Sequence, residues 1–432
     1  MQDRSPLSPE APGGSPSPRD SPGPGLAIFE RIGFFNRFAA AWYLARGYRV
    51  RYLDMAAPVP GWSRPGQEQD GRLERIRWGN LDLHHQFALN NEVLRGIDEA
   101  FRQELGSSRL IGLLGDLVGT EKARDAYLKY LALNRYDQAL KAYQLTETGV
   151  RDGGGRDPVM ILSDPLLPGA ILAARGTGST GFRVPRWNRF FLSLRWLGEK
   201  AGYLGILALL PLYLLAKVGI PSRAAPAPRA SRLGIRVYRT DFGSHRRYRS
   251  VDFLVDGKGL HPGNTLICVE TPLAPLTREA LGKKGYRIAE VDRSLRGVPL
   301  GFLRGCILGR GIPFWARCLP AALGEAPSTI RQTLEFFLTY LLWEAFFTRH
   351  GLSQYVTYND TLPKDVIRNL VFARHGVQTW YYEHSSNTSN LFVPEGREEH
   401  AAVLYAYLNY DHLVAWGDKV RRFYELHPQR VG

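Results

Sequence analysis

A repeated order of strand, helix and strand constrains the fold of this chain more than any other feature of its sequence. Residues 26–55 contain an apolar segment (LAIFE), a segment of helical spacing that ends near Gly47, and a second apolar segment (YRVRYLDM). Residues 264–292 repeat this order, with NTLICVE before a helical segment and YRIAEVD after it. Two strands joined by a crossover helix within about 30 residues form a parallel βαβ unit. The sequence therefore predicts an α/β chain built on parallel sheets.

The same order continues in the last third of the chain. A long helical segment over 329–349 precedes three predicted strands, SQYVTYND, VQTWYYEHS and YDHLVAWG, and a helical segment follows each of the first and third. The helix after the first of these strands has Pro363 in its first turn, a position that proline favours. Because three strands with two complete crossovers do not make a finished α/β domain, we expect this domain to be truncated here.

The chain length predicts several domains. At roughly 100–200 residues per domain, 432 residues suggest two or three. Residues 1–25 are rich in Pro, Ser and Gly and are predicted to form a disordered tail. We expect an N-terminal α/β domain over 26–328, with a helical insertion at about 90–231, and an incomplete C-terminal domain over 329–432.

Residues 183–217 combine basic, aromatic and aliphatic side chains. RVPRWNRFFLSLRW interleaves arginines with aromatic residues, and 16 residues without charge (AGYLGILALLPLYLLA) then separate Lys200 from Lys217. Sixteen residues are fewer than the roughly 20 that a spanning helix needs, and Pro211 interrupts them. We expect a monotopic or re-entrant membrane contact. Its predicted contact residues are Arg186, Trp187, Arg189, Phe190, Trp196, Leu207, Leu210 and Leu214. The alternative is a buried pair of core helices with a basic, solvated edge.

The net charge and the cysteine content limit the kinds of binding partner and the cell compartment that we expect for this protein. A net charge of +15 favours anionic partners, namely nucleic acid, nucleotide phosphates or an anionic membrane surface. Nucleic acid is not expected, because the basic residues are scattered or gather beside the apolar run and no nucleic-acid motif is present. Three cysteines without a C-x-x-C spacing predict neither a disulfide framework nor a zinc site. They fit a reducing cytoplasm, and the N-terminus lacks the apolar region of a secretory signal.

Residues that offer polar side-chain or backbone groups follow four of the predicted strands. In open α/β sheets, ligands bind beyond the carboxyl ends of the strands, so these residues are the candidate site. They are Glu270, Asn359, Asp360, Glu383, His384, Ser385, Ser386, Asn387, Trp416 and Gly417, with Lys364 in the helix that follows Asp360. The first βα turn lacks G-x-G-x-x-G, so a nicotinamide or flavin fingerprint is absent.

Each of these residues has a chemical and a structural interpretation. His384 suits a general base or a phosphate ligand, and Ser385, Ser386 and Asn387 suit a diphosphate cradle, unless this loop only caps the next element. Asp360 suits a base or a ligand for a sugar hydroxyl, or it caps the helix at Pro363. Glu270 equally fits a carboxylate placed at a helix N-terminus.

The C-terminal third resembles a known family. From YVTYNDTLPKDVIRNLVFARHGVQTWYYEHSSNTSNLF to YDHLVAWGDKVRRFYELHP the chain is similar to bacterial surface-carbohydrate biosynthesis proteins (capsule or lipopolysaccharide) that are glycosyltransferase-like, of the GT-B type. The matching features are the YND strand end, the strand that ends in His384, and the strand that ends in Trp416 and Gly417. NTLICVETPLAP also fits, and the N-terminal half fits loosely.

The resemblance implies two Rossmann-like domains around a cleft. The C-terminal domain would bind a nucleotide-sugar donor, with His384 and its Ser and Asn neighbours on the phosphate, and the N-terminal domain would bind a lipid-linked or polysaccharide acceptor. Glu270 or Asp360 would take the proton of the acceptor hydroxyl, and no bound metal or other cofactor is required.

The expected protein is a cytoplasmic transferase attached peripherally to the inner face of the cell membrane. Better-known relatives have Gly where this chain has Ser385, next to His384. The second hypothesis is therefore a non-catalytic, membrane-associated scaffold of polysaccharide assembly.

Overall fold

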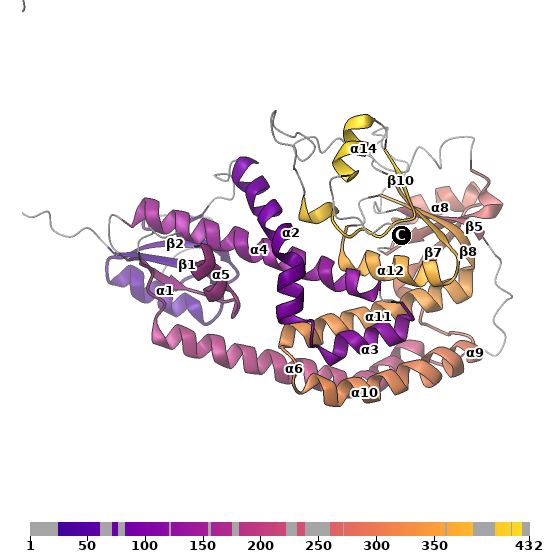
Figure 1. Cartoon of the computed structure of the whole chain (residues 1–432), viewed down its shortest axis with the longest axis horizontal. Helices are drawn as coiled ribbons and strands as arrows, with labels where there is room; N and C mark the ends of the chain where they lie inside the picture. The colour runs from indigo at the N-terminus through magenta and orange to yellow at the C-terminus, as the bar shows by residue number, and fades with distance from the viewer. Residues whose placement is uncertain are drawn as a thin grey trace, which may run out of the picture. The chain divides into compact units, whose positions relative to one another are not determined.

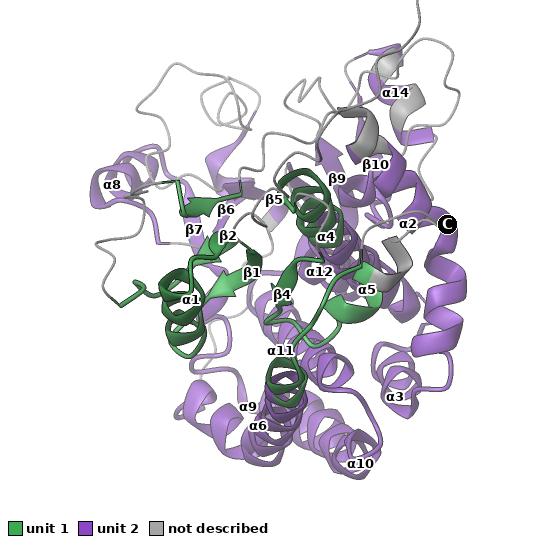
Figure 2. Ribbon diagram, turned by 90° about the vertical axis from the view of Figure 1, so that its left-hand side faces the viewer, with its two compact units in different colours: residues 1–78, 141–190 green, residues 79–140, 191–432 purple. Residues whose placement is uncertain are grey.

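The chain contains two compact units. The computed structural model describes residues 25–60, 71–76, 83–120, 122–153, 157–174, 181–221, 231–237, 260–270, 272–358, 361–382, 402–415 and 417–425. One unit comprises residues 1–78 and 141–190 and the other comprises 79–140 and 191–432 (Figure 2). All pairings between the described strands are parallel, which confirms the predicted α/β class with parallel sheets.

The first unit is built on a sheet of four described strands. β1 (Leu26–Ile32), β2 (Arg49–Met55), β3 (Leu73–Arg75) and β4 (Val159–Ile161) lie in the order β3-β2-β1-β4. α1 (Asn36–Ala45) connects β1 to β2, as the spacing predicts, and Ala40, Tyr43 and Leu44 pack toward the strands. α5 (Leu167–Ala174) follows β4.

The second unit is built on a sheet of six described strands. They are β5 (Ser231–Val237), β6 (Thr265–Val269), β7 (Arg287–Glu290), β8 (Leu352–Thr357), β9 (Gln378–Tyr382) and β10 (His412–Val414). Their order is β10-β9-β8-β5-β6-β7. Figure 1 labels β5, β7, β8 and β10 among them. Numbered from β5 along the chain, this is the 3-2-1-4-5-6 order of a doubly wound sheet. The order reverses between β5 and β8, which is the topological switch point.

The predicted boundary between residues 328 and 329 is wrong. It separates β5, β6 and β7 from β8, β9 and β10, whereas β5 pairs directly with β8 along Gly234↔Tyr355 and Ile235↔Val356. A Cβ on Gly234 would lie 2.7 Å from the Leu352 side chain and 2.9 Å from that of Tyr355, so a larger residue here would force these side chains to shift. The helical residues 79–140 also belong to this second unit instead of forming an insertion in the first.

Helices cover both faces of the six-stranded sheet. α11 (Pro327–His350) and α12 (Pro363–Arg374) share a core with Cys268 of β6 and Tyr355 of β8, while α8 (Pro275–Lys283) packs on the opposite face. The remaining helices of this unit are α2 (Leu83–Glu104), α3 (Arg109–Val118), α9 (Leu300–Phe302), α10 (Ile312–Ala322), α14 (Asp418–Glu425), the π-helix η4 (Leu303–Gly311) and the 3-10 turns η2 (Pro262–Asn264), η3 (Val291–Arg293) and η5 (Val403–Tyr405).

Two long helices extend over both units. α4 (Ala123–Asp152) and α6 (Arg186–Val218) each contain residues of the first and of the second unit. α6 continues through Pro211 over 33 residues, and among the described residues it is a helix long and apolar enough to cross a membrane, by length and composition alone.

The membrane-contact prediction needs a correction within α6. Arg186, Trp187, Arg189 and Phe190 are exposed and Trp196 is half-buried. Leu207, Leu210 and Leu214, however, are 3%, 1% and 2% exposed and belong to the core of the second unit. Spacings of three and four residues place them on one side of the helix, and that side faces the protein.

Candidate functional site

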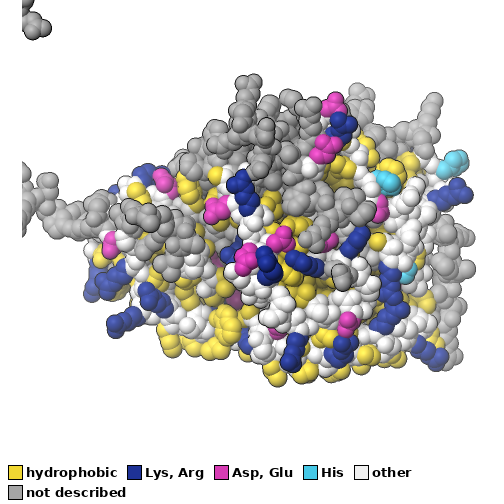
Figure 3. Space-filling view, viewed as in Figure 1, with side chains coloured by type: hydrophobic (Ala, Val, Ile, Leu, Met, Phe, Trp, Pro, Cys, Tyr) yellow, Lys and Arg dark blue, Asp and Glu magenta, His cyan; other side chains and the backbone are white. Residues whose placement is uncertain are grey.

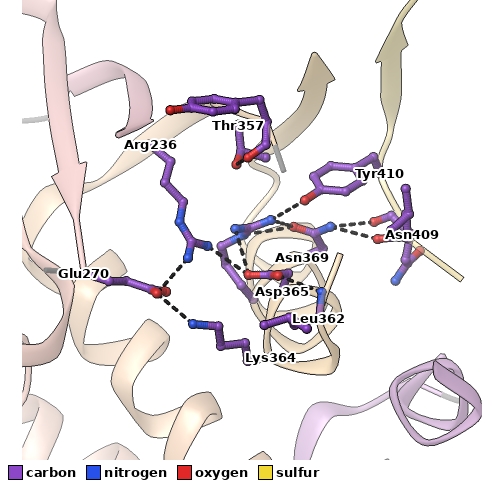
Figure 4. Close-up of polar contacts among 12 residues, drawn as sticks. Arg236, Glu270, Thr357, Leu362, Lys364, Asp365, Asn369, Asn409 and Tyr410 are labelled. Carbon is purple, nitrogen blue, oxygen red and sulfur yellow. Dashed lines mark hydrogen bonds and ion pairs between the residues drawn. The ribbon is translucent and has the colours of Figure 1, made fainter. Parts of the chain in front are cut away.

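Charged side chains gather beyond the carboxyl ends of β5, β6 and β8, at the topological switch point (Figure 4). Arg236 lies near the end of β5, Glu270 directly follows β6, and five residues separate the end of β8 from the start of α12. Arg236, Cys268 and Glu270 point to one face of the sheet because alternate residues of a strand share a face. This is the face on which α12 packs.

Glu270 is held between two cations. Its Oε2 atom lies 2.7 Å from Nη2 of Arg236 and 2.7 Å from Nζ of Lys364. The Arg236 side chain is 3% exposed, whereas Glu270 is 26% and Lys364 44% exposed. Within the described residues, Oε1 of Glu270 carries no hydrogen bond or ion pair. Glu270 and Lys364 therefore form the solvent-facing side of the cluster.

Asp365 is the second carboxylate of the cluster and pairs with two arginines. Oδ1 of Asp365 lies 2.8 Å from Nη1 of Arg236 and 3.6 Å from Nη1 of Arg368, and its side chain is 5% exposed. Oδ2 accepts the backbone N–H of Leu362 at 2.9 Å, so the same carboxylate caps the N-terminus of α12. An acidic group in the first turn is also favoured by the helix dipole.

Arg368 connects this cluster to the segment before β10. It is fully buried, donates to Asn369 Oδ1 and to the Tyr410 hydroxyl at 2.8 Å, and lies over the Tyr355 ring. Asn369 in turn donates to the backbone carbonyls of Leu408 and Asn409. These bonds fix α12 relative to the last strand of the sheet.

Burial changes the titration of neighbouring groups. It raises the pKa of the Cys268 thiol to about 12, so this thiol stays protonated at neutral pH, and Cys306 and Cys318 are likewise buried and free. Burial also raises the pKa of Asp292, which follows β7, and the negative charge of Glu270 raises it further. Lys129 of α4 is fully buried, which lowers its pKa to about 7, and it donates to the carbonyls of Val403, Leu404 and Ala406.

The structure brings together two of the predicted site residues, Glu270 and Lys364. Gly417 lies elsewhere, in a pocket of about 810 Å3 beside β10 that is also lined by Tyr381, Tyr410 and Tyr424. The other predicted residues lie outside the described part of the chain; they are Asn359, Asp360, Glu383, His384, Ser385, Ser386, Asn387 and Trp416. The strands that precede them end at the same edge, with β8 about 10 Å and β9 about 14 Å from β6 at the usual strand spacing.

Sequence reasoning missed Arg236, Asp365 and Arg368. The sequence could have indicated Arg236, because an arginine inside the apolar segment LGIRVY would be buried in a strand and would require a buried partner. Asp365 stands at the third helical position after Leu362, where an acidic side chain reaches back to the cap. Nothing local marks Arg368. Among the described residues, no group of three His, Cys, Asp or Glu side chains is placed to hold a metal ion.

Comparison with known proteins gives one finding. The family described as "Polysaccharide biosynthesis PFTS motif protein" matches residues 321–431, a range that includes β8, α12, β9, β10 and α14. No curated protein and no solved structure matches the chain significantly. The matched range includes Lys364, Asp365 and Arg368, and thus one side of the charged cluster. The match supports a role for this chain in polysaccharide biosynthesis.

Proposed function

We propose that the chain is a metal-independent glycosyltransferase of the GT-B type. It would transfer a sugar from a nucleotide-sugar donor to a lipid-linked or polysaccharide acceptor in the assembly of cell-surface polysaccharide. The observation that carries the proposal is the position of Glu270, ion-paired through one oxygen only, at the carboxyl edge and switch point of a doubly wound sheet. The family match to polysaccharide biosynthesis supports the substrate class.

Glu270 is the proposed general base. The acceptor hydroxyl oxygen attacks the anomeric carbon, the bond to the nucleotide phosphate breaks, and the hydroxyl proton moves to Oε1 of Glu270. Arg236, buried and bonded to Oε2, holds the carboxylate in place. Arg236 is therefore a positioning residue, because it acts through Glu270.

Lys364 is the proposed ligand of the donor phosphate. It lies in the first turn of α12, where backbone N–H groups and the helix dipole favour an anion. Its ammonium group would leave Glu270 to meet the phosphate and stabilise the leaving group. His384, Ser385, Ser386, Asn387 and Asp360 keep their predicted roles in donor binding and proton transfer.

The test is a thermal-shift and calorimetric titration with CMP, CDP, UDP and their nucleotide sugars. We expect one nucleotide class to stabilise the chain and Lys364→Gln to weaken its binding roughly tenfold, as expected for one charged phosphate contact. Lys283→Gln, on the exposed Lys283–Glu279 pair of α8, is the matched control and should bind normally. Glu270→Gln should retain nucleotide binding and reduce turnover by about 100-fold or more.

A non-catalytic scaffold is the second candidate. It is favoured by the same ion pairs, because Arg236 and Lys364 neutralise the carboxylates of Glu270 and Asp365, as in a network that only stabilises the fold. A cooperatively folded chain that binds none of these nucleotides would support the scaffold and contradict the transferase. Nucleotide binding that is unchanged by Lys364→Gln would contradict the proposed phosphate contact.

A further inference from the structure

α6 buries one side of its apolar stretch and exposes the other. Leu207, Leu210, Leu214 and Val218 lie in the core of the second unit. On the opposite side Ile206, Leu209, Leu212 and Leu215 are 53%, 60%, 64% and 59% exposed. The most apolar 18-residue window has a mean hydropathy of 1.8 and is only 22% buried. A soluble helix usually exposes polar residues here, so the outer face of α6 is suited to an apolar environment.

A second apolar and basic segment lies beside it. Trp315 of α10 donates its indole N–H to the Leu207 carbonyl at 2.6 Å, and both helices share one core. Residues 295–324, which include η4 and α10, contain four arginines and no acidic residue. Leu308 and Leu323 are 52% and 64% exposed. Figure 3 shows hydrophobic side chains with Lys and Arg among them along the edge where α6 and α10 run in Figure 1.

Each end of the uncharged stretch carries a lysine paired with an aromatic ring. Nζ of Lys200 lies 5.3 Å from the Trp196 ring centre, and Nζ of Lys217 lies 5.5 Å from that of Tyr213. The 16 residues between the lysines span about 24 Å. Lysines and amphipathic rings at both ends of an apolar helix match the chemistry of the lipid headgroup region.

We propose that the outer face of α6, with η4 and α10, binds the surface of an anionic phospholipid bilayer. The helix lies in the plane of the membrane, because Leu207, Leu210, Leu214 and Val218 pack in the core of the second unit and leave that side unavailable to lipid. The excess of arginine and lysine on this face selects anionic headgroups, and the exposed leucines insert among the acyl chains. This proposal stands without the transferase activity.

The lipid surface adjoins the candidate site. The backbone N–H of Gly297 donates to the Val218 carbonyl at 2.8 Å, so the end of α6 contacts the chain that follows η3. Lys217 also lowers the pKa of Asp292 in η3, against the larger effect of burial. Asp292 and Glu270 follow neighbouring strands. If the proposed transferase function holds, a lipid-linked acceptor bound at this surface would therefore lie near the carboxyl edge of the sheet, where Glu270 is located.

The test is co-sedimentation of the full chain with vesicles. Vesicles of phosphatidylcholine alone are compared with vesicles that contain about one third phosphatidylglycerol. We expect strong binding to the anionic vesicles, weaker binding at 1 M salt, and release by alkaline carbonate. Leu212→Ser should weaken vesicle binding roughly tenfold, which is the loss of affinity expected when one leucine side chain is removed from an apolar interface. Leu276→Ser on α8, where Leu276 is 81% exposed, is the matched control and should bind normally.

Charge is tested separately. Arg304→Gln should lower the preference for anionic vesicles, while Lys283→Gln should not. Failure to bind any vesicle, or equal binding by Leu212→Ser and wild type, overturns the proposal. A dimer that Leu212→Ser dissociates would show that a second copy covers this face, and resistance to carbonate would show a spanning helix. Dissociation of such a dimer, or resistance to carbonate, would also overturn the proposed binding to the membrane surface. Both outcomes are independent of the nucleotide titration that tests the transferase.

Discussion

At the scale of single residues, the guanidinium of Arg236 holds the candidate site together. It contacts Glu270 with one nitrogen and Asp365 with another, and its side chain is 3% exposed. Arg368 and Lys364 supply the other positive charges, so two carboxylates are matched by three cations. A buried charge is tolerated only when it is paired in this way. Removal of Arg236 should therefore cost more than the loss of an ordinary surface ion pair.

Arg236→Met tests this expectation. It leaves the buried Asp365 without its closest cation and should reduce the free energy of unfolding by about 3–5 kcal/mol. Lys283→Met breaks the exposed pair with Glu279 and should cost less than about 1 kcal/mol. Urea unfolding followed by circular dichroism measures both. Equal effects of the two substitutions would show that the Arg236 network does not stabilise the fold.

His350 gives a pH dependence at the same scale. Burial lowers its pKa to about 4, and the charges of Arg349 and Arg287 act in the same direction. The unfolded chain therefore binds a proton at this residue between pH 6.5 and 4 while the folded chain does not, and stability falls as pH falls through that range. His350→Phe keeps the ring packing against Phe346 and should show a shallower decline. Parallel stability curves for the two proteins between pH 6.5 and 4 would contradict this.

At the scale of elements, α6 contains a proline that its surroundings accommodate. Pro211 has no N–H, so the Leu207 carbonyl, four residues earlier, lacks its partner within the helix. The Trp315 indole N–H of α10 bonds to that carbonyl instead. The bond links α6 to α10 and explains how a 33-residue helix continues through the proline.

A double-mutant cycle tests this exchange of donors. Trp315→Phe should cost about 1–3 kcal/mol, because it leaves a part-buried carbonyl unpaired in addition to the packing it removes. Pro211→Ala restores a backbone donor and should stabilise the Trp315→Phe protein by about 1 kcal/mol more than it stabilises wild type. Unfolding free energies of the four proteins give the coupling. A coupling near zero would mean that the indole does not replace the missing N–H.

At the scale of the whole molecule, the six-stranded sheet joins distant parts of the chain. β5 lies between β6 and β8, and more than 100 residues separate β5 from β8 along the chain. α11 connects the two halves and packs with α12 over the strands of both. We therefore expect the second unit to unfold as one cooperative unit across residue 328.

Separate expression of residues 1–328 and 329–432 tests this cooperativity. The 329–432 fragment alone should lack a sharp thermal transition, because β8 loses β5 and exposes an apolar edge. Co-expression with 1–328 should restore a cooperative transition in a complex of the two fragments. A sharp transition of the 329–432 fragment by itself would show that the sheet divides between β5 and β8.

The local elements were predictable from the sequence. The predicted strands at LAIFE, NTLICVE, YRIAEVD and VQTWYYEHS and the helix that begins at Pro363 are all present, because periodicity and cap residues act over a few neighbouring positions. The rule that ligands bind at strand ends also selected Glu270 and Lys364, which contact each other.

Local pattern could not show which strands are neighbours or which side of a helix is covered. The sequence alone therefore determined the parallel α/β class, the positions of most of the strands and the basic, apolar character of α6. Only the tertiary structure decided that β5 to β10 form one sheet, that Arg236 meets Asp365, 129 residues away, and that Leu207, Leu210 and Leu214 face the protein. These are contacts between segments far apart in the chain, and they depend on how complementary surfaces pack together, which no single segment encodes.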